Sequence, residues 1–197
     1  VGEDGDDVSQ SAVTAPGSCR KGHRPPPDDH LFASGSNGVA MVSTGDSAPD
    51  ISATIANGEV EAFELSEHLG DGPVVLAFFP GAFTPPCSNE MVALQDQLAE
   101  FEAAGATLLG VSADSAFSQN AFREEHDIEF DLVSDMSGEA LQAYGLEIDI
   151  DDLGLHGIAN RAVFVLDDDG EVTYSWVADD PTNEPEYEEL LEAAQSA

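Results

Sequence analysis

The chain has 197 residues, 42% of them hydrophobic, and its 40 acidic residues against five lysines and arginines give a formal net charge of −35. That length suits a single domain of roughly 100–200 residues, and the charge excludes nucleic acid and anionic membrane surfaces as partners, since both would repel it. Because salt screens the repulsion among so many carboxylates, the composition favours a protein that works in concentrated salt and predicts a halophilic source.

Cysteine content and apolar runs bear on the compartment. Two cysteines cannot make a disulfide framework. The sequence contains no apolar run of about 18 residues that would cross a membrane. Its first residues show no basic segment followed by an apolar core, which a secretory signal requires. A cytoplasmic protein without a membrane span is therefore the expectation.

The first 40 residues differ in composition from the rest. They hold three of the five basic residues and three consecutive prolines, but only six of the 40 acidic residues and no periodic apolar pattern. Two interpretations stay open: a disordered N-terminal tail, or an artefactual extension that precedes a true start at Met41. Both predict no fold over residues 1–44 and one domain over residues 45–197.

The next part of the chain predicts a hairpin followed by a strand, a helix and a strand. Short alternating runs on both sides of Asn57-Gly58 are typical of a β-hairpin. The apolar run Val74–Phe79, bounded by Gly-Pro and Pro-Gly, indicates a strand that is buried on both faces. Apolar residues then recur at helical spacing, which predicts one helix that stops before Gly105. A strand over Thr107–Val111 completes a β-α-β unit.

The remaining elements are predicted as helices over Ser115–His126, Ser137–Tyr144 and Tyr187–Ala194, and strands over Ala162–Leu166 and Val172–Val177. An Asp-Asp-Asp-Gly turn joins the two strands, so the sheet should contain antiparallel as well as parallel neighbours. The acidic run Asp149–Asp152 lacks the spacing of a calcium loop and is expected to be a solvated loop. The predicted fold class is therefore α/β, a central mixed β-sheet flanked by helices, with an N-terminal β-hairpin.

Cys87 lies in the stretch FFPGAFTPPCSNEM, Phe78–Met91, where it follows the buried strand and stands at the start of the next helix. Ligand sites in α/β sheets lie beyond the carboxyl ends of the strands. The free N–H groups and the positive dipole end of a helix start favour a thiolate over a thiol. A lone cysteine is more often a small buried hydrophobe, so its neighbours have to decide between the two roles.

The neighbours of the cysteine favour chemistry. Pro80, Thr84 and Cys87 form the pattern P-x-x-x-T-x-x-C. In this pattern the threonine hydroxyl can reach the same oxygen atom that the cysteine sulfur would attack. Pro85 and Pro86 stiffen the approach and remove two competing N–H donors. The set therefore indicates a reactive thiolate rather than a structural cysteine.

This stretch is similar to the active-site segment of peroxiredoxins, the AhpC/TSA family of the thioredoxin superfamily. The resemblance runs from about Ala48 to the last residue. Two further segments carry it, LVSDMSGEALQAYGL and IANRAVFVLDDDG, the second with Arg161 at its head. The resemblance implies a thioredoxin-like fold and a thiol-dependent peroxidase, which is an oxidoreductase.

The resemblance also implies roles for five residues. Cys87 matches the peroxidatic cysteine, whose thiolate attacks hydrogen peroxide or an organic hydroperoxide and becomes a sulfenic acid. Thr84 and Arg161 match the groups that hold the peroxide and stabilise the thiolate, and Pro80 matches the residue that shields the pocket from water. Glu90 matches a position that pairs with the arginine, which is sensible because an unpaired carboxylate there would compete with the thiolate for positive potential.

Recycling of the sulfenic acid needs a second thiol, and the resemblance points to an external one. In the group that resembles bacterioferritin comigratory protein, the second cysteine usually stands five residues on, where this chain has Val92; the chain has no cysteine near its C-terminus either. The sequence is therefore most similar to the one-cysteine AhpE-like group, and its acidic composition suggests a halophilic archaeon. The expected reductant is a low-molecular-weight thiol or a thioredoxin- or glutaredoxin-like protein. Cys19, in the N-terminal extension, is the other candidate for resolving Cys87.

The remaining expectations concern partners and alternative functions. We expect no metal site, because the histidines share no ligand spacing, and no cofactor, because the chain has no Gly-rich phosphate loop. Family resemblance allows a homodimer. The alternative function is a peroxide-sensing redox partner protein that passes its oxidation on as a mixed disulfide without sustained turnover. A purely structural thioredoxin-like module is the third option.

Overall fold

The computed structural model of the protein describes residues 40–197. Cys19 and residues 1–39 of the predicted extension lie outside the described residues. Val42, which belongs to the predicted extension, is buried, and its N–H donates to the carbonyl of Tyr144 at 3.4 Å. The folded part of the chain therefore includes residues that precede position 45.

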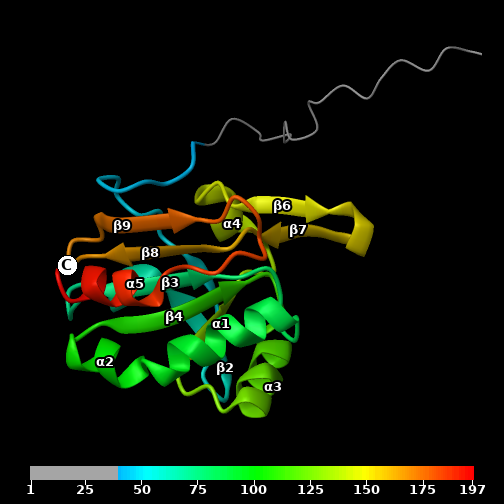
Figure 1. Cartoon of the computed structure of the whole chain (residues 1–197), viewed down its shortest axis with the longest axis horizontal. Coiled ribbons are helices and arrows are strands. Elements are labelled where there is room, and N and C mark those ends of the chain that lie inside the picture. The colour runs from blue at the N-terminus through cyan, green and yellow to red at the C-terminus, as the bar shows by residue number, and fades with distance from the viewer. Residues whose placement is uncertain (1–39) are drawn as a thin grey trace, which may run out of the picture. The chain divides into compact units, whose positions relative to one another are not determined.

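A seven-stranded sheet forms the centre of the described part (Figure 1). Its order is β2-β1-β5-β4-β3-β8-β9; β3, β4 and β5 run parallel, and the other neighbours run antiparallel. The strands are β1 (Ser52–Ala56), β2 (Val60–Glu64), β3 (Val74–Phe78), β4 (Thr107–Ser112), β5 (Asp131–Ser134), β8 (Ala162–Leu166) and β9 (Val172–Val177). The sheet is mixed, as the sequence predicts.

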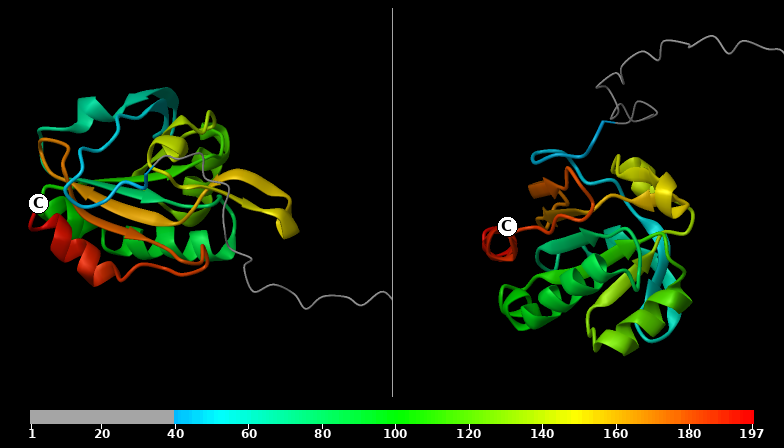
Figure 2. Two further views of the ribbon diagram at one scale, coloured as in Figure 1. Left: turned by 90° about the horizontal axis from the view of Figure 1, so that it is seen from above. Right: turned by 45° about the vertical axis from the view of Figure 1, so that its right-hand side comes forward.

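Helices cover both faces of this sheet. They are the α-helices α1 (Pro85–Asp96), α2 (Leu98–Ala103), α3 (Ala116–His126), α4 (Glu139–Ala143) and α5 (Tyr187–Ala194), with the 3-10 helices η1 (Leu65–His68) and η2 (Asp151–Leu153). Figure 2 shows α1, α2 and α5 on one side of the sheet and α4 on the other. None of the helices in the described part is both long and apolar enough to cross a membrane.

The side chains of β3 alternate between two apolar clusters, one on each face of the sheet. Val74, Leu76 and Phe78 belong to the cluster that contains the buried residues of α4. Val75 and Ala77 belong to the other cluster, which contains the buried apolar residues of α1, α2, α3 and α5. All five side chains are completely buried, which explains why the central strand is an unbroken apolar run.

Most of the predicted elements are confirmed, with small differences at their ends. Residues 57–59 connect β1 and β2, and Gly58 adopts a φ of 98°, in the left-handed region that favours glycine. The predicted closing helix Tyr187–Ala194 has the same bounds in the structure. The predicted fold class, α/β with a mixed sheet, flanking helices and an N-terminal hairpin, is also confirmed.

The helix predicted to run until Gly105 is interrupted. The chain leaves the helical conformation at Gln97, which has a ψ of 4°, so that α1 ends at Asp96 and α2 begins at Leu98. The sequence has neither glycine nor proline at this point, and the apolar spacing continues across the break. Strand β5 also escapes prediction, because four residues are too few to show a period.

A separate two-stranded sheet consists of β6 (Glu147–Ile150) and β7 (Leu155–Ala159), and it projects at one end of the described part in Figure 1. The run Asp149–Asp152 is predicted to be a solvated loop. Its aspartates are exposed, but the run forms the end of β6 and the start of η2 instead of a loop. Asp149 accepts a hydrogen bond from the N–H of Gly157 at 2.8 Å across the hairpin. Its carboxylate therefore stabilises the hairpin.

Candidate active site

Cys87 lies in the first turn of α1, beyond the carboxyl end of β3. Pro85 and Pro86 occupy the first two helical positions, where the N–H groups would have no partner within the helix. The N–H of Ser88 donates to the carbonyl of Thr84 at 2.9 Å and begins the helical hydrogen bonding. Cys87 therefore sits at the positive end of the helix dipole, although it is only 1% exposed.

The pairing of β3 with β8 brings Arg161 to the same place. Phe78, the last residue of β3, is the register partner of Ala162, the first residue of β8. The loop that follows β3 and the residue that precedes β8 therefore begin side by side. From this position Arg161 Nη2 donates to Cys87 Sγ at 3.4 Å.

Arg161 has three acceptors, which together fix its guanidinium group. Nη1 donates to Glu90 Oε2, Nη2 donates to Cys87, and Nε donates to the carbonyl of Pro181 at 3.0 Å. Burial lowers the pKa of Arg161, but the neighbouring Glu90 and Cys87 raise it by more, so that the net effect is a raised pKa. The side chain is fully buried and remains a cation, so Arg161 is a positioned charge rather than a solvated surface arginine.

Glu90 lies one turn after Cys87 on the same face of α1, and it is also fully buried. Burial raises the pKa of Glu90 to about 8; Arg161 acts in the opposite direction, and Glu184 adds to the rise. Oε2 contacts Arg161, whereas Oε1 is buried without a hydrogen-bond partner among the described residues. The structure thus brings the two residues of the expected pair together and leaves one carboxyl oxygen unpaired.

Thr84 and Pro80 lie in the loop between β3 and α1. The hydroxyl of Thr84 donates to the carbonyl of Gly81 at 2.9 Å, within its own loop. Pro80 is half-buried two residues after the end of β3. Within the described part of the chain, the hydrogen-bond partner of the Cys87 sulfur is Arg161 and not the threonine.

Asp114 holds this loop in place, and sequence reasoning missed it. Its Oδ2 accepts hydrogen bonds from the N–H of Ala82 at 2.8 Å and from the hydroxyl of Ser112 at 2.9 Å. Phe83, which follows Ala82 and comes shortly before α1, adopts a φ of 62°, which is uncommon for a residue other than glycine. The available signal was position: Asp114 follows β4 and so lies at the same edge of the sheet as Cys87.

An aromatic group packs beside the first turn of α1. Phe122 of α3 contacts Phe83 and His126 edge-on, with ring centroids 5.3 Å and 4.8 Å away. His126 Nε2 lies 3.3 Å from the Oγ of Ser88, the residue after Cys87. This contact fastens the end of α3 to the turn that carries the thiol.

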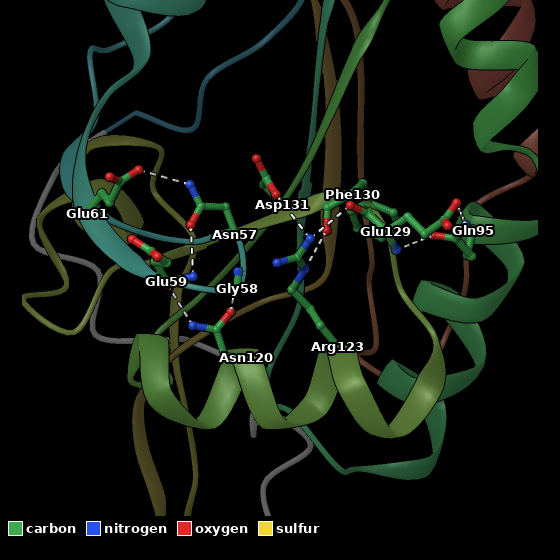
Figure 3. Close-up of polar contacts among 10 residues, drawn as sticks. All are labelled: Asn57, Gly58, Glu59, Glu61, Gln95, Asn120, Arg123, Glu129, Phe130 and Asp131. Atoms are coloured by element: carbon green, nitrogen blue, oxygen red, sulfur yellow. Dashed lines mark hydrogen bonds and ion pairs between the residues drawn. The ribbon is translucent and has the colours of Figure 1, made fainter.

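Arg123 is the second basic residue of the described part, and it has a structural role. Figure 3 shows its guanidinium directed at the segment that leads from α3 into β5: Nε donates to the carbonyl of Phe130 at 2.8 Å, and Nη2 donates to the carbonyl of Glu129 at 2.8 Å and to Asp131 Oδ1 at 3.1 Å. Arg123 also lines a surface groove, together with other residues of α3, residues 127–129 and the β1–β2 turn, and this groove does not include Cys87. Among residues 40–197, Arg161 is therefore the cation that serves the thiol.

The chemistry that this arrangement supports is that of a stabilised thiolate. A buried sulfur that accepts a hydrogen bond from a fixed guanidinium, at the positive end of a helix, is better able to carry negative charge. The described residues contain no group of three or more histidine, cysteine, aspartate or glutamate side chains that could hold a metal ion.

Comparisons with known proteins agree with this description. Residues 44–175 match the AhpC/TSA family. The chain is 34% identical over 144 residues to the chloroplastic 2-cysteine peroxiredoxin of Chattonella marina var. antiqua, and the match covers 69% of this chain and 71% of that protein. It is 32% identical over 133 residues to the putative chloroplastic peroxiredoxin Q of Oryza sativa subsp. indica, covering 68% of this chain and 58%, less than two thirds, of the rice protein.

The fold has solved counterparts as well. The crystal structure of peroxidoxin BcpB from Mycobacterium tuberculosis is similar with a TM-score of 0.67 and 29% sequence identity. The similarity covers 80% of this chain and 98% of that one, so it extends over almost the whole of the solved domain. The described part of this chain therefore has the thioredoxin-like fold of these neighbours.

Proposed function

Because this chain belongs to the AhpC/TSA family of peroxiredoxins, whose members are thiol peroxidases, we propose that it reduces hydrogen peroxide and organic hydroperoxides at Cys87. The observation that carries the proposal is the hydrogen bond from Arg161 to the Cys87 sulfur, at 3.4 Å in a fully buried site. Moving a charged group from water into the protein interior costs roughly several kcal/mol. A cysteine with a purely structural role would not require a buried arginine at that cost.

In the proposed reaction the Cys87 thiolate attacks the distal oxygen of the hydroperoxide. An S–O bond forms as the O–O bond breaks, and the leaving hydroxide or alkoxide takes up a proton to become water or an alcohol. The sulfur is oxidised to a sulfenic acid, and the peroxide is reduced by two electrons. No metal or cofactor has a part in this scheme.

The fixed arginine suits the transition state of this displacement. Negative charge moves from the sulfur to the leaving oxygen, and a donor that is already in place stabilises it without reorganisation. The carbonyl of Pro181 holds Arg161 Nε, so that its Nη2 stays directed at the sulfur. We assign Thr84 as the second group that binds the peroxide, through the hydroxyl oxygen lone pairs that its bond to Gly81 leaves free.

Pro80 and Glu90 have supporting roles in this proposal. Pro80 follows β3 at the head of the loop, where its ring shields the reacting oxygens from water. Glu90 pairs with Arg161 and so contributes to the orientation of the guanidinium. Neither residue forms or breaks a covalent bond during the reaction.

We further propose a one-cysteine mechanism with an external thiol, either a small thiol or a thioredoxin- or glutaredoxin-like protein. Support comes from the sequence: Cys87 is the single cysteine of residues 40–197, and Val92 stands where relatives of the bacterioferritin comigratory type carry their second cysteine. The same reasoning favours the AhpE-like group. The net charge of −35 supports a halophilic source.

The test is peroxide consumption by the full chain in concentrated salt, with a small thiol or a thioredoxin system as reductant. The matched variants are Cys87→Ser and Cys19→Ser. We expect sustained turnover in the wild type and in Cys19→Ser, and none in Cys87→Ser. Consumption that stops after one equivalent would support the peroxide-sensing alternative, and loss of turnover in Cys19→Ser would overturn the one-cysteine mechanism.

A further inference from the structure

The buried site contains one cation and two acids. Cys87, Glu90 and Arg161 are each at most 1% exposed, and Arg161 contacts both of the others. With Glu90 ionised, the Arg161–Glu90 pair is neutral, and a thiolate at Cys87 would add a buried negative charge without a countercharge. A buried charge of this kind is strongly destabilising. A neutral Glu90 would instead leave the whole charge of Arg161 to the thiolate.

The second oxygen of Glu90 is an independent sign of a neutral carboxyl. A carboxylate normally accepts hydrogen bonds at both oxygens, yet Oε1 is buried with no partner among the described residues. Leaving an ionised oxygen without a partner in the protein interior costs more than leaving a neutral one. Burial accordingly raises the pKa of Glu90 to about 8.

The surrounding groups also disfavour an ionised Glu90. From the segment before α5, the carboxylate of Glu184 acts on Glu90 as a like charge. Tyr187 of α5 donates its hydroxyl proton to Glu184 at 2.7 Å and therefore not to Glu90. On the side of α3, His126 is engaged with Ser88. Arg161 is thus the one group that favours the ionised form, and it is shared with Cys87.

We propose that Glu90 holds a proton whenever Cys87 is a thiolate, so that the two acids share one proton and the buried cluster has no net charge. The inference rests on the proposed function in that it takes the thiolate as the reactive form. Protonation of the two residues is then coupled: loss of the proton from one residue opposes its loss from the other. Glu90 acts through Arg161, as a positioning residue that leaves the guanidinium charge available to the sulfur.

The direct test is the infrared difference spectrum between the wild type and Glu90→Gln, recorded with the full chain across the pH range over which Cys87 becomes reactive to iodoacetamide. We expect the wild type to retain the C=O stretching band of one protonated carboxyl group after Cys87 has ionised. In Cys87→Ser no thiolate opposes the ionisation of Glu90, so the band should disappear at a lower pH than in the wild type. A wild type that loses the band as Cys87 ionises, or that loses it at the same pH as Cys87→Ser, would overturn the proposal.

A second measurement depends on reactivity rather than on spectra. The amide of Glu90→Gln resembles a protonated carboxyl group, so the iodoacetamide reaction rate at neutral pH should change by less than about twofold. If Glu90 were ionised instead, its replacement would free Arg161 and raise the thiolate fraction by about tenfold for each pH unit gained, which would contradict the proposal. These outcomes differ from a failure of the proposed function, in which Cys87 would react with iodoacetamide but the protein would consume no peroxide.

Discussion

Phe78 and Ala162 are register partners in the antiparallel pair β3–β8, and the active site depends on this pairing. Phe78 precedes the loop that leads to Cys87, and Ala162 follows Arg161. Cys87 and Arg161 are 74 positions apart in the chain, yet the register of the two strands brings them within hydrogen-bonding distance. A shift of one residue in this pair would turn the side chain of Arg161 to the other face of the sheet.

Replacement of Arg161 should make Cys87 less reactive. In Arg161→Met the sulfur loses its buried countercharge, and we expect its reaction with iodoacetamide at neutral pH to slow by at least about tenfold, the change that a shift of one pH unit would cause. Iodoacetamide reaction rates across pH measure this, and peroxide turnover should fall with them. Arg161→Lys is the matched control: it retains a charge but cannot hold Pro181, Glu90 and Cys87 at once, so its rates should be intermediate. Unchanged alkylation in Arg161→Met would contradict the assigned role.

The hydroxyl of Thr84 should matter for turnover and little for folding. Thr84 caps α1 without a side-chain hydrogen bond to the helix, and its bond to Gly81 is worth about 1 kcal/mol. Removal of one oxyanion-hole donor typically costs about 10²- to 10³-fold in rate, and we expect a loss of the same order in kcat/KM when Thr84→Val removes the hydroxyl that binds the peroxide. Initial peroxide rates decide the point, with Thr84→Ser as the control that retains the hydroxyl. Equal rates in Thr84→Val and Thr84→Ser would show that the hydroxyl has no part in the reaction.

The sequence is informative where the pattern is local. The apolar run of β3, the Asn-Gly turn and the closing helix all follow from residues close together in the chain, and the structure confirms them. The break at Gln97 has no such local mark, because no helix-breaking residue stands there. Strand β6 does alternate acidic with half-buried apolar residues, but the alternation covers only four residues and was overlooked in favour of an acidic loop.

The candidate site is only partly local. The sequence pattern alone shows that Cys87 stands at a helix start, since strand and helix adjoin it. The contact with Arg161 depends on which strands are neighbours, and periodicity does not contain that information; family resemblance supplied it. Asp114 was missed although the predicted β-α-β unit places the ends of β3 and β4 at one edge of the sheet, because no local pattern marks its bond to Ala82.

The protonation of Glu90 should make stability depend on pH. The pKa of Glu90 is about 8 in the folded state against an ordinary value of 4.5, so the folded protein binds this proton more tightly than the unfolded chain does. The free energy of unfolding should therefore decrease as pH rises from about 4.5 through about 8, and the contribution of Glu90 should be complete only below that range. Urea unfolding at several pH values measures the slope. Glu90→Gln should remove this part of it, and an equal slope in both proteins would contradict the raised pKa.

Gly110 of β4 should not accept a side chain. A Cβ at this position would lie 2.5 Å from Leu132 Cδ2 and 3.3 Å from both Met91 Sδ and Phe79 Cε1. Met91 belongs to α1, so crowding here pushes on the helix that carries Cys87. We expect Gly110→Ala to lower the free energy of unfolding by about 1–3 kcal/mol, measured by urea unfolding.

The crowding at Gly110 can be separated from a general loss of stability. In Leu132→Ala the nearest neighbour is shortened, so the double variant Gly110→Ala/Leu132→Ala should lose less stability than the sum of the two single variants. Strict additivity would mean that Leu132 is not the source of the strain.

Salt should stabilise the folded protein by screening its carboxylates. The net charge is −35, and the two basic residues of the described part are already engaged, Arg123 with residues 129–131 and Arg161 in the buried site. Carboxylates elsewhere on the surface therefore repel one another, and compaction brings them closer than they are in the unfolded chain. The urea midpoint should rise with KCl until the screening length is about 3 Å, near 1 M. Sucrose at equal osmolality is the uncharged control, and an equal rise in sucrose would show that solvent exclusion, not screening, is responsible.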